Sequence, residues 1–370
     1  MSMQDAGRMS RFSGARVMVI GHTGFKGSWL TLWLLEMGAQ VIGVSLGIPT
    51  EPAHVLAAQM LESISDHRAD IRDTTQLRAL MKATQPDFVF HLAAQALVRR
   101  SYNDPLETWQ TNTFGTINVL EALRGLEQPC TAILITSDKC YDNVEWVWGY
   151  RETDPLGGPD PYSASKGGAE LAIRSYVRSF FPAAGMVRIG VGRAGNVIGG
   201  GDWAEDRIVP DCIRAWSRGE SVPLRNPLAT RPWQHVLEPL SGYLTLAMAL
   251  NEQSCWHGEA YNFGPPAQQN HSVGELVSKM ATHWEGGRWE DVSAQYGGPY
   301  ESHLLKLNCD KALHQLKWRA VWDFDRTVHE TVHWYVRYYQ NPGGSIRDTS
   351  AAQIHAYIET ARAERLSWAM

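Results

Sequence analysis

Residues 16–45 read RVMVIGHTGFKGSWLTLWLLEMGAQVIGVS, and the architecture can be worked out from this stretch. A short apolar run, a glycine-rich turn, a helix-length apolar segment and a second apolar run follow one another, which is the order of a βαβ unit. Both runs are continuously apolar rather than alternating, as expected for parallel strands covered on both faces. The stretch predicts an α/β protein built on a doubly wound parallel sheet.

Three glycines in the turn, Gly21, Gly24 and Gly27, are spaced as G-x-x-G-x-x-G. Glycines here let the backbone approach a diphosphate, and the start of the next helix offers unpaired N–H groups and the positive end of its dipole. A tight turn without a ligand is the alternative, which the strand–turn–helix context disfavours. The loop predicts a Rossmann-type sheet that binds NAD. The expected contacts are Gly21, His22, Gly24, Phe25, Lys26, Gly27 and, after a later apolar run, Ala93.

Two features of this cofactor site are unusual. The second run ends as GVS at residues 43–45, without the Asp or Glu that often binds the ribose. His22 and Lys26 add bulk and charge beside the expected diphosphate. We therefore expect the adenosine end to be held by Asp70 and Ile71, after the third strand, and NAD to be held loosely.

The alternation of strands and helices continues up to about residue 195. Further apolar runs end near residue 70 and at DFVFHLAA, TAILITS and MVRIGVGRAG, separated by helix-length segments at 104–126 and 163–181. Beyond that point glycine, proline and tryptophan are dense, as in GNVIGGGDW and NFGPPAQQN. We expect an NAD-binding domain over 14–194. Residues 195–370 should form mainly a smaller C-terminal lobe that closes over a ligand, with some segments returning to the first domain.

Composition excludes several classes of protein. The 370 residues are 44% hydrophobic and 20% charged, and no apolar run approaches the roughly 20 residues of a membrane helix. A formal charge of −5 without a basic block argues against nucleic acid or an anionic membrane as a partner. The first residues lack the apolar core of a signal peptide. The cysteines are odd in number and unpaired in spacing, so we expect a reducing cytoplasm and no disulfide framework: Cys130, Cys140, Cys212, Cys255 and Cys309.

Two short motifs suggest acid–base chemistry. Tyr162 and Lys166 begin a predicted helix and share one face, so the lysine charge should lower the tyrosine pKa and let it take a proton from a hydroxyl. Ser137, Asp138 and Lys139 follow an apolar strand, at the usual catalytic edge of a parallel sheet. Y-x-x-x-K alone is a weak pattern, and the triplet could be a solvated loop with an incidental ion pair. Together they predict a catalytic set of all five residues.

The second half holds candidate anion contacts in segments 193–211 and 231–240. The planar fork of arginine suits diphosphate oxygens, although each arginine could equally be structural. Arg231 is the stronger candidate and Arg207 the weaker. The full set is Asn196, Arg207, Arg231 and His235, with Trp203 or Trp233 beside a nucleobase.

The segment His329–His333 reads HETVH and fits the H-E-x-x-H pattern of zinc proteases. Both histidines would share one face of a helix, as zinc ligands must. The following WYVRYY and the position near the end of the chain favour a packing helix instead. We expect no metal.

Six segments together, GHTGFKG, HLAAQ, TSDKCYDN, YSASK, RAGNVIGGGDW and RPWQHVLEPLSGYL, resemble the extended short-chain dehydrogenase/reductase family, and within it the CDP-glucose branch of the nucleotide-sugar dehydratases. The resemblance runs from about Arg16 to the C-terminal helices. Dehydratases acting on dTDP-sugars typically carry Asp-Glu where this chain has Asp138-Lys139, which favours CDP. The resemblance implies an NAD-binding sheet, a smaller C-terminal nucleotide-sugar-binding lobe, and a homodimer or dimer of dimers.

The resemblance also implies a reaction, the loss of water from CDP-glucose to give CDP-4-keto-6-deoxyglucose. Tyr162, helped by Ser137 and Lys166, would deprotonate the 4-hydroxyl while hydride leaves C4 for NAD. Lys139 would then remove the C5 proton, Asp138 would protonate the departing 6-hydroxyl, and the hydride would return to C6. The alternatives are a dehydratase of dTDP-, UDP- or GDP-glucose, or a nucleotide-sugar epimerase or reductase, which would not need the Asp138-Lys139 pair.

Overall fold

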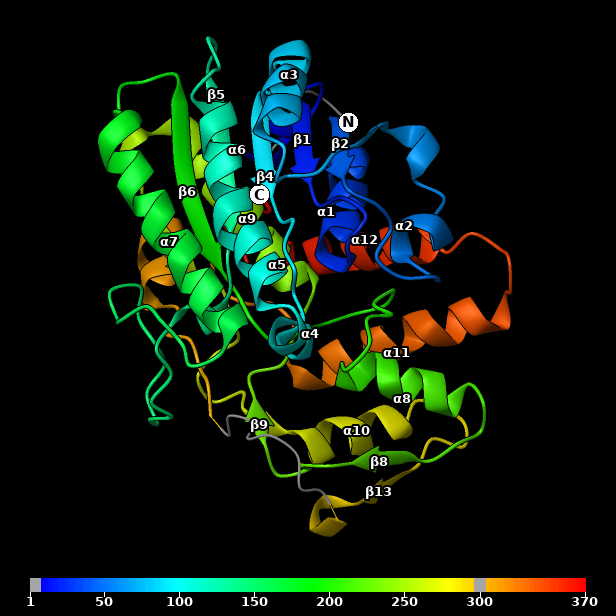
Figure 1. Ribbon diagram of the computed structural model, residues 1–370. Helices are drawn as coiled ribbons and strands as arrows, with labels where there is room; N and C mark the ends of the chain where they lie inside the picture. Colours follow the sequence, from blue (N-terminus) through cyan, green and yellow to red (C-terminus); the bar gives the residue numbers. More distant parts are fainter. Residues whose placement is uncertain (1–7, 296–303) are drawn as a thin grey trace.

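The computed structural model describes residues 8–295 and 304–370, and its centre is a seven-stranded parallel sheet (Figure 1). The strand order is β11-β6-β5-β4-β1-β2-β3, so the direction of winding reverses between β1 and β4. This confirms the predicted Rossmann-type doubly wound sheet. The strands are β1 Arg16–Ile20, β2 Gln40–Ser45, β3 Ser65–Arg68, β4 Phe88–His91, β5 Cys130–Ile135, β6 Val187–Arg193 and β11 Ala260–Asn262.

One predicted strand is polar and exposed instead of apolar. The run ending near residue 70 was expected to be apolar, but β3 reads SDHR and is largely exposed. It is the edge strand and pairs only with β2 in the sheet, so it needs no apolar side chains to bury.

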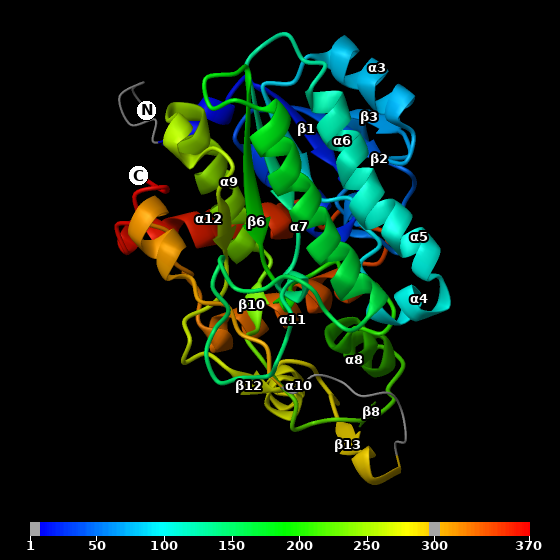
Figure 2. The same cartoon turned by 60° about the vertical axis from the view of Figure 1, so that its left-hand side comes forward.

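Alternating side chains of the strands build two cores, one on each face of the sheet. Val17 and Val19 of β1 belong to the larger core, whereas Met18 and Ile20 belong to the smaller one. Helices α1 (Phe25–Glu36), α9 (Leu237–Glu252) and α12 (Arg347–Ala363) cover the first face. Helices α3 (Thr74–Thr84), α6 (Gly115–Leu123) and α7 (Pro161–Phe180) cover the second, where α6 and α7 lie side by side (Figure 2).

The expected helix over 104–126 is interrupted. It consists of α5 (Pro105–Trp109), a π-helical turn η3 (Gln110–Phe114) and α6. The side chain of Asp104 accepts a hydrogen bond from the backbone N–H of Glu107 and so begins α5. The π turn adds one residue to the winding and turns the Asn112 side chain toward the loop after β4.

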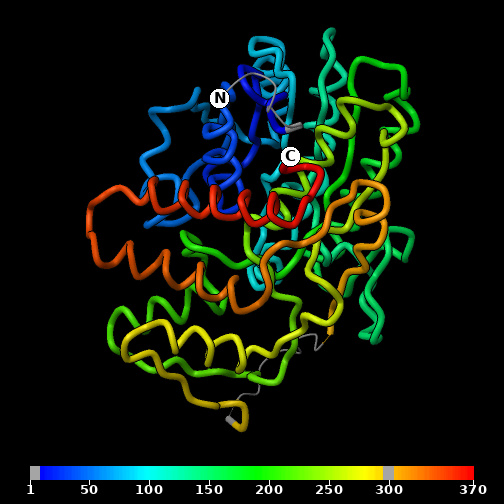
Figure 3. Tube along the Cα trace, turned by 180° about the vertical axis from the view of Figure 1, so that it is seen from behind, coloured from blue at the N-terminus to red at the C-terminus, as the bar shows by residue number. Residues whose placement is uncertain are grey.

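The remaining elements gather beyond the carboxyl ends of the strands, while α9 and β11 return to the sheet from the second half of the chain (Figure 1). Helices α11 and α12 form a hairpin, seen from behind in Figure 3. Within residues 8–295 and 304–370, no helix is long and apolar enough to cross a membrane. The other helices and strands are α2 His54–Ala57, α4 Val98–Asn103, β7 Val197–Ile198, α8 Ile208–Trp216, β8 Val222–Leu224, β9 Thr230–Arg231, β10 Gln234–His235, β12 His271–Ser272, α10 Val273–Ala281, β13 Trp289–Asp291 and α11 Phe324–Gln340.

Candidate active site

A cavity of about 930 Å³ lies at the carboxyl ends of the strands. It includes the end of the glycine loop after β1 and the residues after β4, which is where the winding reverses and where sheets of this kind bind ligands. Residues 201–207 form a strap along its wall. The lining includes Gly21, 23–27, 49–54, Leu92, 94–97, 135–137, Tyr162, Lys166, 201–207 and Tyr339.

The glycine loop has the shape that a dinucleotide diphosphate requires. Gly21 has a φ of +99°, and a Cβ there would lie 2.6 Å from the backbone nitrogen of Ala93. A Cβ on Gly27 would lie 2.0 Å from the Gly21 carbonyl oxygen. Gly24 is the N-cap of α1 and has no side chain to accept from the first N–H groups of the helix, so these groups can bind an anion. The loop therefore fits NAD, and Ala93 supports it from behind rather than lining the cavity.

The expectation that His22 lies beside the diphosphate is wrong. The ring is completely buried, with Nδ1 3.0 Å from Ser45 Oγ and Nε2 3.0 Å from Asp66 Oδ1. Burial lowers its pKa. A Cβ on Gly43 would come within 2.6 Å of the ring, so glycine in β2 makes room for the imidazole. The bulk of His22 is directed toward the sheet.

Lys26, in contrast, lines the cavity as expected. Burial lowers the pKa of its ammonium to about 8. The charge of Asp138 opposes this lowering of the pKa, while the charges of Arg207 and Lys166 contribute to it, so Lys26 interacts electrostatically with all three groups.

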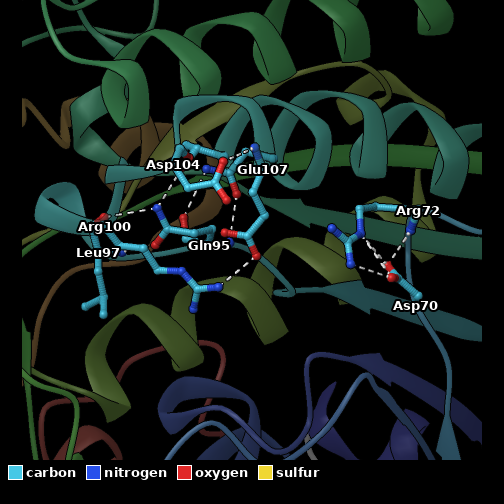
Figure 4. Close-up of polar contacts among 9 residues, drawn as sticks. Asp70, Arg72, Gln95, Leu97, Arg100, Asp104 and Glu107 are labelled. Carbon is cyan, nitrogen blue, oxygen red and sulfur yellow. Dashed lines mark hydrogen bonds and ion pairs between the residues drawn. The ribbon is translucent and has the colours of Figure 1, made fainter. Parts of the chain in front are cut away.

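Asp70 and Ile71 do not line the cavity. Arg72 donates to both carboxylate oxygens of Asp70, from Nε to Oδ1 at 3.0 Å and from Nη2 to Oδ2 at 2.7 Å (Figure 4). These hydrogen bonds hold the pKa of Asp70 below its usual value. Ile71 is buried, and its carbonyl accepts a hydrogen bond from Asn118 Nδ2 at 3.0 Å. A contact of either residue with adenosine stays a prediction.

The structure brings Ser137, Tyr162 and Lys166 together on the cavity wall. Ser137 follows β5, and the other two occupy the first turns of α7, whose first turn is fixed by Asp160 accepting from Ser163 N at 2.9 Å. Burial raises the pKa of Tyr162 to about 12, while a hydrogen bond with Ser137 and the charge of Arg207 lower it. The lowering expected from Lys166 is thus supplied by other groups. Burial also lowers the pKa of Lys166 to about 8.

Asp138 and Lys139 lie directly behind Ser137, in a short 3-10 turn. Asp138 is buried and accepts hydrogen bonds from Ser137 Oγ at 2.9 Å and from Asn196 Nδ2 at 3.3 Å. A Cβ at Gly195 would lie 1.9 Å from the Asp138 carboxylate, so glycine is required there. Lys139 is half-buried, and neither it nor Asp138 is among the residues that line the cavity.

Sequence reasoning missed a network that supports the wall of the cavity after β4. Gln95 Oε1 accepts from Leu97 N at 2.6 Å, and Gln95 Nε2 donates to Leu97 O at 3.0 Å (Figure 4). Asn112 pairs with the backbone of Gln95 and donates to Ser165 Oγ at 2.9 Å. Ser165 Oγ donates to the carbonyl of Tyr162 at 2.7 Å. Gln95 is the last residue of the segment HLAAQ, which could have drawn attention to it. The π turn that directs Asn112 has no recognisable sequence pattern.

The predicted ligand contacts of the second half separate into two groups. Arg207, the weaker candidate, lines the cavity and pairs with Asp202 at 2.8 Å. Arg231 lies on β9, outside the lining, and its contact with a diphosphate stays a prediction. His235 is completely buried between Trp29 and Trp322, so its expected ligand contact is corrected to a packing role.

Two further predictions concern aromatic and metal-binding residues. Trp203 lines the cavity, whereas Trp233 donates its indole N–H to His271 O at 3.1 Å. His329 and His333 lie exposed on α11, while Glu330 between them is buried and paired with Arg326 at 2.7 Å. In the described part of the chain, no group of three or more His, Cys, Asp or Glu side chains is arranged to hold a metal.

Comparisons with known proteins agree on the kind of enzyme that this chain resembles. The model of the GDP-mannose 4,6 dehydratase family matches residues 18–331. A CDP-glucose 4,6-dehydratase of Salmonella typhimurium is 48% identical over 331 residues, which are 88% of this chain and 91% of the relative. A CDP-paratose 2-epimerase of Salmonella typhi is 27% identical over 72% of this chain and 83% of its own. A dTDP-glucose 4,6-dehydratase from Streptomyces venezuelae, solved with NAD, has a TM-score of 0.72 and 22% identity over 88% of this chain and 98% of its own.

Proposed function

The chain belongs to the nucleotide-sugar dehydratases of the extended short-chain dehydrogenase/reductase family, and we propose that it dehydrates CDP-glucose to CDP-4-keto-6-deoxyglucose with NAD as cofactor. The observation that carries the proposal is the 48% identity with a CDP-glucose 4,6-dehydratase over nearly the whole chain. The site agrees with it, because the glycine loop and the Ser137, Tyr162 and Lys166 side chains share one cavity.

The glycine loop and the first turn of α1 would hold the NAD diphosphate, with Lys26 beside it. When bound there, NAD supplies a reversible hydride acceptor, which takes hydride from C4 of the sugar and returns it to C6. Arg207 is the cation in the strap that supports binding of the substrate diphosphate.

Tyr162 is the proposed base for the 4-hydroxyl. A phenol with a pKa of about 12 holds its proton near neutral pH, so it needs help to ionise. Ser137 supplies a hydrogen bond and Arg207 supplies positive charge, and both lower the pKa of Tyr162. Loss of the hydroxyl proton to Tyr162, together with hydride transfer from C4 to NAD, would give a C4 ketone, which acidifies the proton on C5.

The elimination step is assigned to the turn after Ser137. Lys139 would remove the C5 proton, and Asp138 would protonate the departing 6-hydroxyl. Asp138 is buried directly after Ser137, and its carboxyl accepts hydrogen bonds from Ser137 Oγ and Asn196 Nδ2. The assignment requires this turn to move toward the sugar when substrate binds, since both side chains now lie behind Ser137.

Three features of the whole protein belong to the same proposal. Residues 14–194 would form the NAD-binding domain and 195–370 mainly the nucleotide-sugar lobe, with α9 and β11 as the segments that return. The free cysteines of the described residues suit the cytoplasm. Exposed apolar side chains on adjoining helices suit a homodimer, or a dimer of dimers.

The decisive experiment offers CDP-, dTDP-, UDP- and GDP-glucose to the protein with NAD. We expect CDP-glucose to give a product with a C6 methyl group, and deuterium placed on C4 to appear at C6. If another nucleotide sugar is preferred, the substrate assignment changes to that nucleobase. A product that keeps its 6-hydroxyl would identify an epimerase or reductase.

A further inference from the structure

His54 lies where four parts of the molecule meet beside the cavity. It ends the cavity-lining segment 49–54, begins α2, and is 1% exposed. Its ring stacks on Trp29 of α1, with centroids 4.7 Å apart and planes 9° apart. A Cβ at Gly201 would lie 2.6 Å from the His54 Cβ, so the strap passes at close range. The proposed reaction assigns this residue no role.

Both ring nitrogens of His54 have partners. Nδ1 lies 2.9 Å from Ser28 Oγ in α1, and Nε2 lies 3.0 Å from Ser350 Oγ in α12. Burial lowers the pKa of His54 to about 3, so the ring is neutral and carries one N–H. The Ser28 hydroxyl donates to Phe25 O at 2.9 Å, which makes Nδ1 the donor toward Ser28.

This tautomer also fixes the direction of the hydrogen bonds on the Nε2 side of the ring. Nε2 must then accept, and Ser350 is the hydroxyl that can donate to it. Ser350 Oγ accepts in turn from Trp334 Nε1 of α11 at 2.8 Å. The Ser350 hydroxyl also lies 3.1 Å from Ile346 O, but donation to the ring satisfies a buried nitrogen. Hydrogen bonds therefore run in one direction from α11, through α12 and α2, into the first turn of α1.

This chain of hydrogen bonds ends at the cofactor loop. Phe25 and Lys26 line the cavity, and the N–H groups of this turn face the place expected for the diphosphate. Ser350 is outside the lining, on α12, which packs across α1 (Figure 3). We propose that His54 is a positioning residue for the cofactor, which fixes the first turn of α1 through Ser28 and ties it to the α11–α12 hairpin through Ser350. The inference rests on the proposed function, because it takes NAD as the ligand of this loop.

The test measures NAD binding directly, by calorimetric titration without substrate. Ser350→Ala removes the donor to His54 while leaving the cavity wall unchanged. The loss of one buried hydrogen bond should raise the Kd for NAD about three- to tenfold, because the first turn of α1 is held less firmly. Ser350→Thr keeps the hydroxyl and should restore binding. His355→Ala is the matched control, because His355 is exposed on the same helix and pairs with Glu36.

The outcomes separate the two proposals. If Ser350→Ala melts above the titration temperature and binds NAD as tightly as the wild type, His54 does not position the cofactor loop. An equal loss in His355→Ala would also overturn the inference. If Ser350→Ala does not fold, Ser28→Ala breaks the other end of the chain and should show the same three- to tenfold loss. A wild-type protein that binds no NAD at all contradicts the proposed function itself.

Discussion

Tyr162 joins the two halves of the proposed site, because it is fixed by the start of α7 and hydrogen-bonds with Ser137 at the end of β5. Tyr162→Phe removes only the phenolic oxygen. We expect turnover to be abolished while CDP-glucose affinity stays within a few-fold of the wild type. Steady-state rates and a binding titration check both parts, and normal turnover would remove Tyr162 from the mechanism.

Lys139 tests the step that distinguishes a dehydratase from an epimerase. Oxidation at C4 needs Tyr162, Ser137 and Lys166, whereas loss of the C5 proton needs the proposed base. Lys139→Ala should therefore accumulate enzyme-bound NADH on addition of CDP-glucose, with little ketosugar formed. Absorbance of the reduced nicotinamide and product analysis measure this. Product formation at the wild-type rate would show that Lys139 is not the base.

Arg207 and Arg231 can be compared by the same substitution. Arg207 lines the cavity and Arg231 does not, so Arg207→Ala should weaken CDP-glucose and CDP binding more. One charge-assisted contact to a diphosphate contributes about 1.5–3 kcal/mol, which sets the expected loss at roughly tenfold or more. If Arg231→Ala weakens CDP-glucose binding more than Arg207→Ala does, Arg231 is the main diphosphate contact, as the sequence suggested.

At the scale of the elements, α9 is attached to the C-terminal segments through one buried carboxylate. Glu238 is fully buried, and accepts from Val321 N at 2.9 Å, Trp322 N at 2.7 Å and Tyr357 Oη at 2.6 Å. These donors lower its pKa, but burial outweighs them and raises the pKa to about 7. The negative charge of nearby Glu364 contributes to this rise.

The raised pKa predicts a pH-dependent stability. Between pH 4.5, the usual pKa of the carboxyl, and about 7, the folded state binds more protons than the unfolded state. The contribution of Glu238 is therefore complete below the lower value and is lost as pH rises through the higher one. Urea denaturation across this interval should show a steeper decline for the wild type than for Glu238→Gln. Glu364→Gln is the control, and equal slopes for wild type and Glu238→Gln would contradict the assignment.

At the scale of the whole molecule, α5 and α7 lie side by side, with η3 in contact with both (Figure 2). Leu106 is 66% exposed, Phe114 59% and Leu171 49%. Adjoining apolar residues of this size are expected at a symmetric contact between copies of the chain.

The proposed homodimer predicts a specific effect of charge on this face. Leu106→Glu combined with Phe114→Glu should convert the protein to monomers, because the contact would bury unpaired carboxylates. Light scattering during size-exclusion chromatography measures the mass. Leu228→Glu, at an exposed position between β8 and β9, should keep the wild-type mass. A wild type that is itself monomeric would refute the proposal.

Much of the fold and part of the site were predictable because they depend on neighbours in sequence. The order of β1, glycine loop, α1 and β2 follows from apolar periodicity and glycine spacing, both of which act over a few residues. Tyr162 and Lys166 lie one helical turn apart, so a shared face is a local property. The position of Ser137 after β5 likewise needed only the end of a strand.

The tertiary structure alone decided where several side chains point. His22 turns toward the sheet because Gly43 leaves a space there, and Asn112 reaches Gln95 because a π turn rotates it. Arg207, rather than Arg231, lines the cavity because residues 201–207 run along the cavity wall. Such orientations are set by packing partners far away in the chain, and a local pattern carries no information about those partners.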